Sequence, residues 1–152
     1  MSCSSSVFFK IMITFRRNLK GKDRKKMNLS PDAVAKWETS LREAEYMSND
    51  DHIIEHTQGD LWEMMSQTRG NYFFTNEKFI FVGGLLGASN FAVKYSDIKE
   101  LKLVNVGGLI PIIPTGIMVI CQNPENGKTV KHKCSVMKRK EWVEYLRGKA
   151  GL

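Results

Sequence analysis

The segment HIIEH, residues 52–56, brings together two histidines and a glutamate, side-chain types that bind zinc and activate water. It matches the H-x-x-E-H pattern of one class of zinc proteases, in which a helix places both histidines on one face with the glutamate beside the metal-bound water. Here the surrounding residues predict a strand, on which His52 and His56 would share a face and Glu55 would point to the other. We therefore expect a surface strand and keep a zinc hydrolase as a remote alternative.

The remaining nucleophiles and bases form no catalytic arrangement. No serine lies in a G-x-S-x-G context, and His132, although near Cys134, is expected to be a half-buried, hydrogen-bonded histidine. The segment GGLLGA, residues 83–88, lacks the G-x-G-x-x-G spacing and the following helix of a phosphate-binding loop. The sequence therefore predicts a protein that is not an enzyme, with no catalytic residue, cofactor or metal.

Apolar residues are concentrated instead in two places where turns are expected. One is GGLLGA, and the other is VGGLIPIIPTG, residues 106–116, where prolines and glycines would normally accompany polar side chains. These loops could fold back over the open end of the domain or under the N-terminal helix. Alternatively, they form an apolar surface that meets a membrane, a partner or a second copy. The residues of this predicted contact surface are Leu85, Leu86, Leu109, Ile110, Ile112 and Ile113.

The elements that must position these loops follow from hydrophobic periodicity. Residues 30–47 have a serine cap, proline at the first helical position and one apolar stripe, which together predict a helix. The stripe consists of Val34, Trp37, Leu41 and Ala44.

From residue 51 the period becomes that of strands, and we expect about seven short strands. The turn segments TNEK and NPENGK predict hairpins, and Gly59-Asp60 could divide the first strand in two. KRKEWVEYLRGK, residues 138–149, predicts a helix that buries Trp142, Val143 and Leu146 and stops near Gly148.

Composition restricts the class of protein. The chain has 152 residues, enough for one domain with a sizeable core, and a formal net charge of +7. Eight basic residues and one acidic residue lie within residues 1–26, so the rest of the chain is neutral and nucleic acid is not an expected partner. Three sparse cysteines favour a reducing compartment, and no apolar run has the ~20 residues of a membrane span. We expect a cytoplasmic protein, with Cys121 and Cys134 as core residues.

Residues 1–26 allow two interpretations. The basic run RRNLKGKDRKK, together with nearby phenylalanines, could be an arm for acidic lipid or nucleic acid. Alternatively, Met27 is the true start and the preceding residues are leader sequence that is not part of the native protein. In either case we expect this extension to be disordered.

Three segments resemble a known family. GNYFFTNEKFIFVGG, residues 70–84, is similar to the G-x-L-x-L-T-N-x-R-L-I-F pattern of GRAM and bacterial pleckstrin-homology-like domains. KYSDIKELKLV, residues 94–104, resembles that family's Y-x-D-I-x-x-V segment, and KRKEWVEYL resembles its closing helix. The resemblance covers roughly residues 50–147. It implies a mainly β, pleckstrin-homology-like barrel or sandwich: seven antiparallel strands in two packed sheets, with a C-terminal helix closing one end.

The sequence also departs from the family. Lys78 and Phe79 stand where arginine and leucine are common. Members that bind phosphoinositides carry a basic cluster between their first strands, whereas MMSQTRG, residues 64–70, offers only Arg69. Lipid headgroup binding is therefore not carried over onto any residue of the barrel.

Together these features predict a basic extension (residues 1–26), an N-terminal helix (27–49) and a PH-like or GRAM domain (50–150). We expect a non-catalytic adaptor that contacts an unidentified protein partner or self-associates through the apolar loops. The alternative is a peripheral membrane module that inserts these loops and binds acidic lipid.

Overall fold

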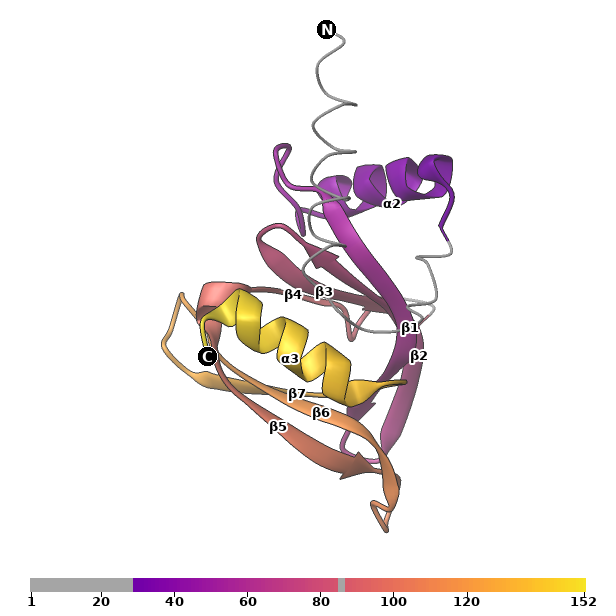
Figure 1. Ribbon diagram of the computed structural model, residues 1–152, viewed down its shortest axis with the longest axis vertical. Coiled ribbons are helices and arrows are strands. Elements are labelled where there is room, and N and C mark those ends of the chain that lie inside the picture. The colour runs from indigo at the N-terminus through magenta and orange to yellow at the C-terminus, as the bar shows by residue number, and fades with distance from the viewer. Residues whose placement is uncertain (1–28, 85–86) are drawn as a thin grey trace, which may run out of the picture.

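The computed structural model describes residues 29–84 and 87–152, which form a mainly β fold with a helix at each end (Figure 1). Residues 1–28, including the predicted basic extension, and Leu85-Leu86 lie outside the described residues. The elements, in chain order, are α2 (Pro31–Glu43), β1 (Ile53–Glu63), β2 (Ser66–Thr75), β3 (Lys78–Gly83), β4 (Phe91–Lys94), the 3₁₀ turn η1 (Tyr95–Asp97), β5 (Ile98–Val106), β6 (Ile113–Gln122), β7 (Thr129–Val136) and α3 (Arg139–Ala150).

The N-terminal helix α2 begins as its sequence predicts. The Ser30 side chain accepts a hydrogen bond from the Ala33 amide, and Pro31 occupies the first turn. Leu41 is buried, and Val34 and Trp37 pack beside it on the sheet. The predicted stripe is one residue too long, because the helix ends at Glu43 and Ala44 is its exposed C-cap.

The hairpin of β2 and β3 divides its aromatic residues between two layers. Across the turn at Asn76-Glu77, Phe74 pairs with Phe79 and Tyr72 with Phe81, and all four side chains enter the inner core. Their neighbours Phe73 and Ile80 point to the opposite face, where α2 covers them. The hairpin predicted at TNEK is thus present, and both of its faces are covered.

The strands form one continuous antiparallel sheet in the order β4-β3-β2-β1-β7-β6-β5. We expected two packed sheets, and the structure joins them in one continuous sheet, because β1 pairs with β2 along its length and with β7 near its end. The sheet bends around a single inner core but does not close, since β4 and β5 are its two unpaired ends. The fold class itself, seven antiparallel strands with a C-terminal helix, is confirmed.

Gly59 lies where β1 begins to pair with β7. A side chain there would have its Cβ 2.3 Å from the Ser135 carbonyl oxygen, so only glycine permits this approach. The Gly59-Asp60 pair does not interrupt β1, which is continuous from Ile53 to Glu63. The glycine therefore marks a close crossing of strands and not a break.

Helix α3 covers the open side of the bent sheet (Figure 1). Trp142 stacks on Phe74 with the ring centroids 4.4 Å apart, and Val143 and Leu146 are buried, as predicted. The helix continues past Gly148 and ends at Ala150, where Gly151 adopts the left-handed conformation of a C-cap. Neither helix of the described residues is long and apolar enough to cross a membrane.

Candidate interaction surface

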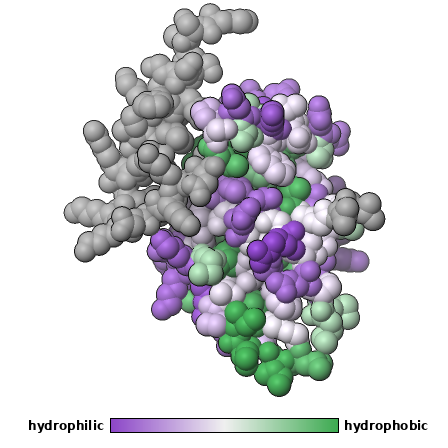
Figure 2. Space-filling model, turned by 90° about the vertical axis from the view of Figure 1, so that its right-hand side faces the viewer, coloured by the Kyte–Doolittle hydropathy of each residue, from purple (hydrophilic) through white to green (hydrophobic). Residues whose placement is uncertain are grey.

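The hairpin of β5 and β6 carries exposed aliphatic residues at its tip, which we call the apolar tip: Leu109, Ile110, Ile112 and Ile113. Their side chains are 86%, 73%, 71% and 45% exposed, respectively. Pairing of Val106 with Ile113 closes the hairpin, and Gly107, with a φ of +147°, allows the chain to turn tightly against the Ile110 carbonyl. The hairpin projects from the bottom of the molecule, where Figure 2 shows a hydrophobic patch.

The base of this hairpin is held from two sides. Arg139, in the first turn of α3, donates hydrogen bonds from Nη1 to the carbonyl oxygens of Val104 (2.5 Å) and Gly116 (3.5 Å). Val104 and Gly116 are paired strand residues, and the strand pairing is irregular between Val104 and Val106, next to this pair. On the other side, the hydroxyls of Thr115 and Ser135 are 2.6 Å apart. The apolar tip is therefore an extension of a fixed framework.

A groove of about 250 Å³ adjoins the apolar tip on the outer face of β1, β2, β6 and β7. Ile113 belongs to both, and the groove also includes Met137, whose side chain is 74% exposed. We call it the Trp62 groove, because Trp62 lines it. The indole Nε1 of Trp62 is buried and has no hydrogen-bond partner among the described residues.

Polar side chains form the far wall of the Trp62 groove. Asp60 accepts hydrogen bonds from Arg69 Nε at 3.0 Å and from Gln67 Nε2 at 2.8 Å. Arg69 is 79% exposed at its side chain and keeps its guanidinium in this ion pair. The groove thus combines an aromatic ring, aliphatic side chains and a charged pair, the composition of protein contact surfaces.

The predicted contact residues have different outcomes. The structure brings Leu109, Ile110, Ile112 and Ile113 together at one tip, whereas Leu85 and Leu86 lie outside the described residues. The Trp62 groove was missed, although alternation along β1 places Gln58, Asp60 and Trp62 on one outward face. The β1–β2 turn was missed as well: Met64 and Met65 are 97% and 62% exposed, and the adjacent methionines in MMSQTRG were the available signal.

The HIIEH segment joins α2 to the sheet. Glu38, which is buried, accepts a hydrogen bond from the Ile53 amide at 2.9 Å and lies 3.4 Å from His52 Nδ1. His56 Nε2 is 2.9 Å from the Asn71 side-chain oxygen and packs on the Phe73 ring. Within the described part of the chain, no three histidine, cysteine or acidic residues come together in a way that could hold a metal. The geometry assigns His52 to the contact between α2 and the sheet and His56 to contacts with β2.

The geometry also gives structural roles to the other candidate catalytic residues, His132 and Cys134. His132 stacks on Phe91 with centroids 3.8 Å apart, and burial lowers the pKa of its ring to about 4. Burial raises the pKa of the Cys121 and Cys134 thiols to about 12, so both stay protonated and unreactive near neutral pH. Both cysteines are buried and free, as expected for core residues.

Solved structures resemble this fold at low sequence identity. The C-terminal domain of an unknown protein from Leishmania infantum has a TM-score of 0.56 and 14% identity, covering 78% of this chain and 97% of that chain. The DH/PH domains of PDZ-RhoGEF, solved in complex with RhoA, give 0.53 and 10% identity, covering 78% of this chain and 35% of that chain. A pleckstrin homology domain from Shewanella amazonensis gives 0.47 and 14%, covering 90% and 98%.

The sequence matches no family model and no curated protein. At these identities the resemblance concerns the fold alone, because one fold supports many functions. One of these neighbours with a TM-score above 0.5, the DH/PH domains of PDZ-RhoGEF, includes a pleckstrin homology domain, in agreement with the fold that the TNEK hairpin and the closing helix suggested.

Proposed function

We propose that this chain is a non-catalytic binding domain that makes a protein–protein contact through the apolar tip and the Trp62 groove. A second copy of the chain is the partner that the geometry supports best. In this proposal the chain is a GRAM or bacterial PH-like domain of the cytoplasm. The support comes from the residues of the TNEK hairpin and of KYSDIKELKLV.

The observation that carries the proposal is the exposure of four aliphatic side chains on a hairpin whose base is fixed. Leu109, Ile110 and Ile112 are each more than two-thirds exposed, while Arg139 holds the strands below them. A monomer gains nothing from apolar area left in water, so a contiguous patch of this kind marks a contact site. Because the framework is rigid, the contact loses little conformational entropy on forming.

The position of the groove supports a second copy as the partner. The apolar tip and the Trp62 groove adjoin through Ile113, so both belong to one surface patch. In a two-fold symmetric pair the same patch meets itself, and each tip would then enter the groove of the other copy. There the incoming tip would pack against Trp62, which lines the groove.

One solved neighbour adds support of a general kind. The DH/PH domains of PDZ-RhoGEF were solved in complex with RhoA, so domains of that protein take part in a protein–protein assembly. The loop that carries the apolar tip has no basic cluster: residues 107–112 contain no charge. This composition favours a protein surface over an acidic lipid headgroup as the first contact.

Analytical ultracentrifugation of the full chain over a range of concentrations tests this function. We expect a concentration-dependent dimer that is lost in the double variant Leu109→Ser/Ile110→Ser. The control is Leu152→Ser, which removes an exposed leucine at the C-terminus, away from the hairpin (Figure 1). A strict monomer throughout would contradict the proposal.

A membrane role is the other outcome that this design detects. If the chain is monomeric but sediments with vesicles of anionic phospholipid, and the double variant does not, the tip is a membrane wedge and self-association is wrong.

A further inference from the structure

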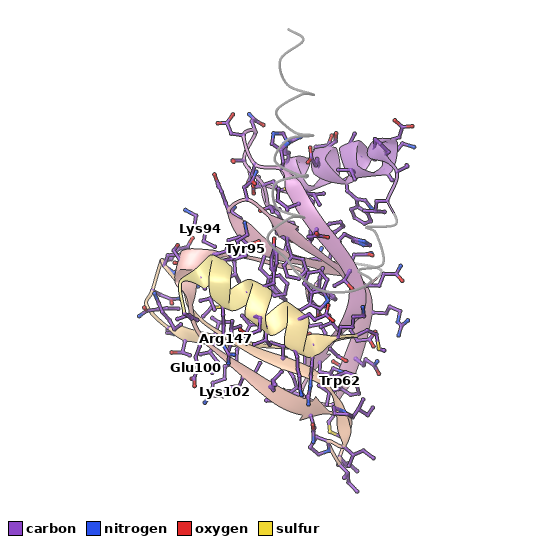
Figure 3. All side chains as sticks on the ribbon, viewed as in Figure 1. Trp62, Lys94, Tyr95, Glu100, Lys102 and Arg147 are labelled. Atoms are coloured by element: carbon purple, nitrogen blue, oxygen red, sulfur yellow. The ribbon has the colours of Figure 1, made fainter. Side chains whose placement is uncertain are left out.

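A second groove, of about 380 Å³, runs along the edge strand β4. It lies between β4 and the end of the β6–β7 hairpin. Lys94, at the end of β4, and Trp62 lie at opposite sides of the molecule (Figure 3), so this groove is separate from the surface described above. We call it the β4 groove.

The β4 groove exposes the backbone edge of the strand. Phe91 and Val93 face the inner core and Ala92 faces the α2 side, yet all of them line the groove, together with Lys94. Residues on opposite faces of one strand can line the same groove when that groove opens onto the backbone edge of the strand. In the described residues β4 pairs with β3 alone, so its other row of backbone groups faces the groove.

The floor of the β4 groove is the inner face of β7. Val130 and His132, two residues apart on that strand, both line it. His132 stacks on Phe91, and burial keeps its ring neutral near pH 7. The floor therefore offers apolar and aromatic area without a charge.

The rims of the β4 groove carry opposite charges. On one rim Lys78 and Lys94 stand directly opposite each other across β3 and β4, an arrangement in which like charges repel. Lys78 Nζ donates to the Tyr46 carbonyl oxygen, and no carboxylate of the described residues forms a salt bridge with either lysine. The other rim carries Asp97 and Glu125. A single acidic side chain beside the lysines would relieve their repulsion. Several acidic side chains in a row would be repelled by Asp97 and Glu125 on the second rim.

We propose that the β4 groove binds an extended peptide segment of a partner, which adds to the edge of β4 as an eighth strand. Its inward side chains are apolar and cover Val130 and His132, and one outward side chain between them is acidic and lies by Lys78 and Lys94. Main-chain hydrogen bonds to β4 supply the affinity, and the alternate side chains supply the specificity.

The test uses the isotope-labelled full chain and the capped peptide Thr-Val-Glu-Val-Thr, followed by NMR. We expect saturable shifts at the amides of residues 91–94 and 130–132, and slower hydrogen exchange at β4 amides that point away from β3. Two control peptides separate the contributions: Thr-Val-Lys-Val-Thr reverses the charge, and a version methylated on alternate amide nitrogens cannot pair as a strand. Both should bind more weakly.

A pair of protein variants tests the charge. Lys94→Glu should weaken binding of the glutamate peptide about fivefold, the size expected for one partly exposed ion pair. Lys131→Glu is the matched control, since Lys131 is exposed on β7, between two residues that line the groove, but does not line it itself, and the change should leave binding unchanged.

Four results would overturn the proposal. One is equal binding of the methylated peptide, and another is equal weakening by both variants. The third is strong exchange protection of all β4 amides in the chain without peptide, which would mean that the edge is already paired. An absence of any β4 response would assign Lys78 and Lys94 to guarding the edge against aggregation.

Discussion

Two hairpins of this protein are equally apolar in sequence and opposite in exposure. The β2–β3 hairpin places Phe73, Phe74 and Ile80 at 0–1% exposure, whereas the β5–β6 hairpin leaves Leu109 and Ile110 at 86% and 73%. The first lies within the sheet, with α2 on one face and the inner core with α3 on the other. The second extends past the edge of every covering layer. Hydrophobic residues therefore stabilise the fold in the first hairpin, whereas those at the tip of the second are available for contact.

The two hairpins also differ in how their turns are fixed. At the β2–β3 turn, Thr75 Oγ1 accepts hydrogen bonds from the Glu77 and Lys78 amides and donates to the buried carboxylate of Asp51, 2.6 Å away. At the β5–β6 hairpin the fixed point is Arg139, which binds the strands below the turn. The first network tightens the turn itself, and the second supports a tip that stays exposed.

The largest expected effect is the loss of a buried ring from the first hairpin. Phe74→Ala removes the ring that stacks on Trp142 and contacts Tyr145, and it should lower the free energy of unfolding by about 3–5 kcal/mol. Urea denaturation measures the change. Ile110→Ala, with the same type of truncation at the exposed tip, is the control and should change stability by less than about 0.5 kcal/mol. Similar losses for both variants would remove the distinction between the hairpins.

The next effect concerns the support of the apolar tip. Arg139→Ala removes the hydrogen bonds to the Val104 and Gly116 carbonyls and should cost about 1–3 kcal/mol, the range for charged hydrogen bonds. Faster amide exchange confined to residues 104–116 should accompany it. Arg147→Ala, which removes an exposed ion pair with Glu144 on the same helix, serves as the control. Unchanged exchange in the hairpin would show that Arg139 does not support it.

The pH dependence of stability tests the burial of His132 at the edge of the inner core. The pKa of this histidine is about 4 in the folded protein, below its ordinary value of 6.5, so the unfolded chain binds more protons between these values. Stability from the neutral ring is present above pH 6.5 and is lost as the pH falls toward 4, by on the order of 1 kcal/mol after allowance for partial exposure.

The measurement is the stability of the wild type relative to His132→Phe, which keeps an aromatic ring against Phe91. The difference between the two proteins should change between pH 6.5 and 4. Carboxylates titrate in both proteins and cancel in this difference. A difference that does not vary with pH would place His132 in water and contradict its burial.

The smallest effect on stability is expected at the tip. Leu109→Ser/Ile110→Ser should change the free energy of unfolding by no more than about 0.5 kcal/mol at a concentration where the chain is monomeric, because these side chains are exposed before and after unfolding. A loss of several kcal/mol would mean that the tip is part of the core.

Local patterns in the sequence predicted much of the fold. TNEK predicted the hairpin of β2 and β3, and Ser30 and Pro31 predicted the start of α2. The glycine expected to stop α3, Gly148, lies within the helix, and Gly151 ends it. Sequence patterns of this kind did not predict that the strands form one bent sheet, since this depends on the pairing of Gly59 with Val136, far apart in the chain. The GRAM-like motifs indicated the fold class and carried no information on this pairing.

The candidate site was less predictable for the same reason. The apolar residues of VGGLIPIIPTG were visible in the sequence, but their exposure depends on which layers cover the hairpin. Arg139 reaches carbonyls 35 and 23 residues earlier in the chain, and Glu38 binds the start of β1 from α2. Such contacts between distant segments leave no local pattern of residue types.

The central claim is that the tip of one copy lies in the Trp62 groove of another. An NMR experiment that detects contacts only between a labelled and an unlabelled copy tests it most directly. We predict intermolecular contacts between the methyl groups of Leu109 and Ile110 and the indole of Trp62. Their absence at concentrations where ultracentrifugation shows a dimer would contradict the account.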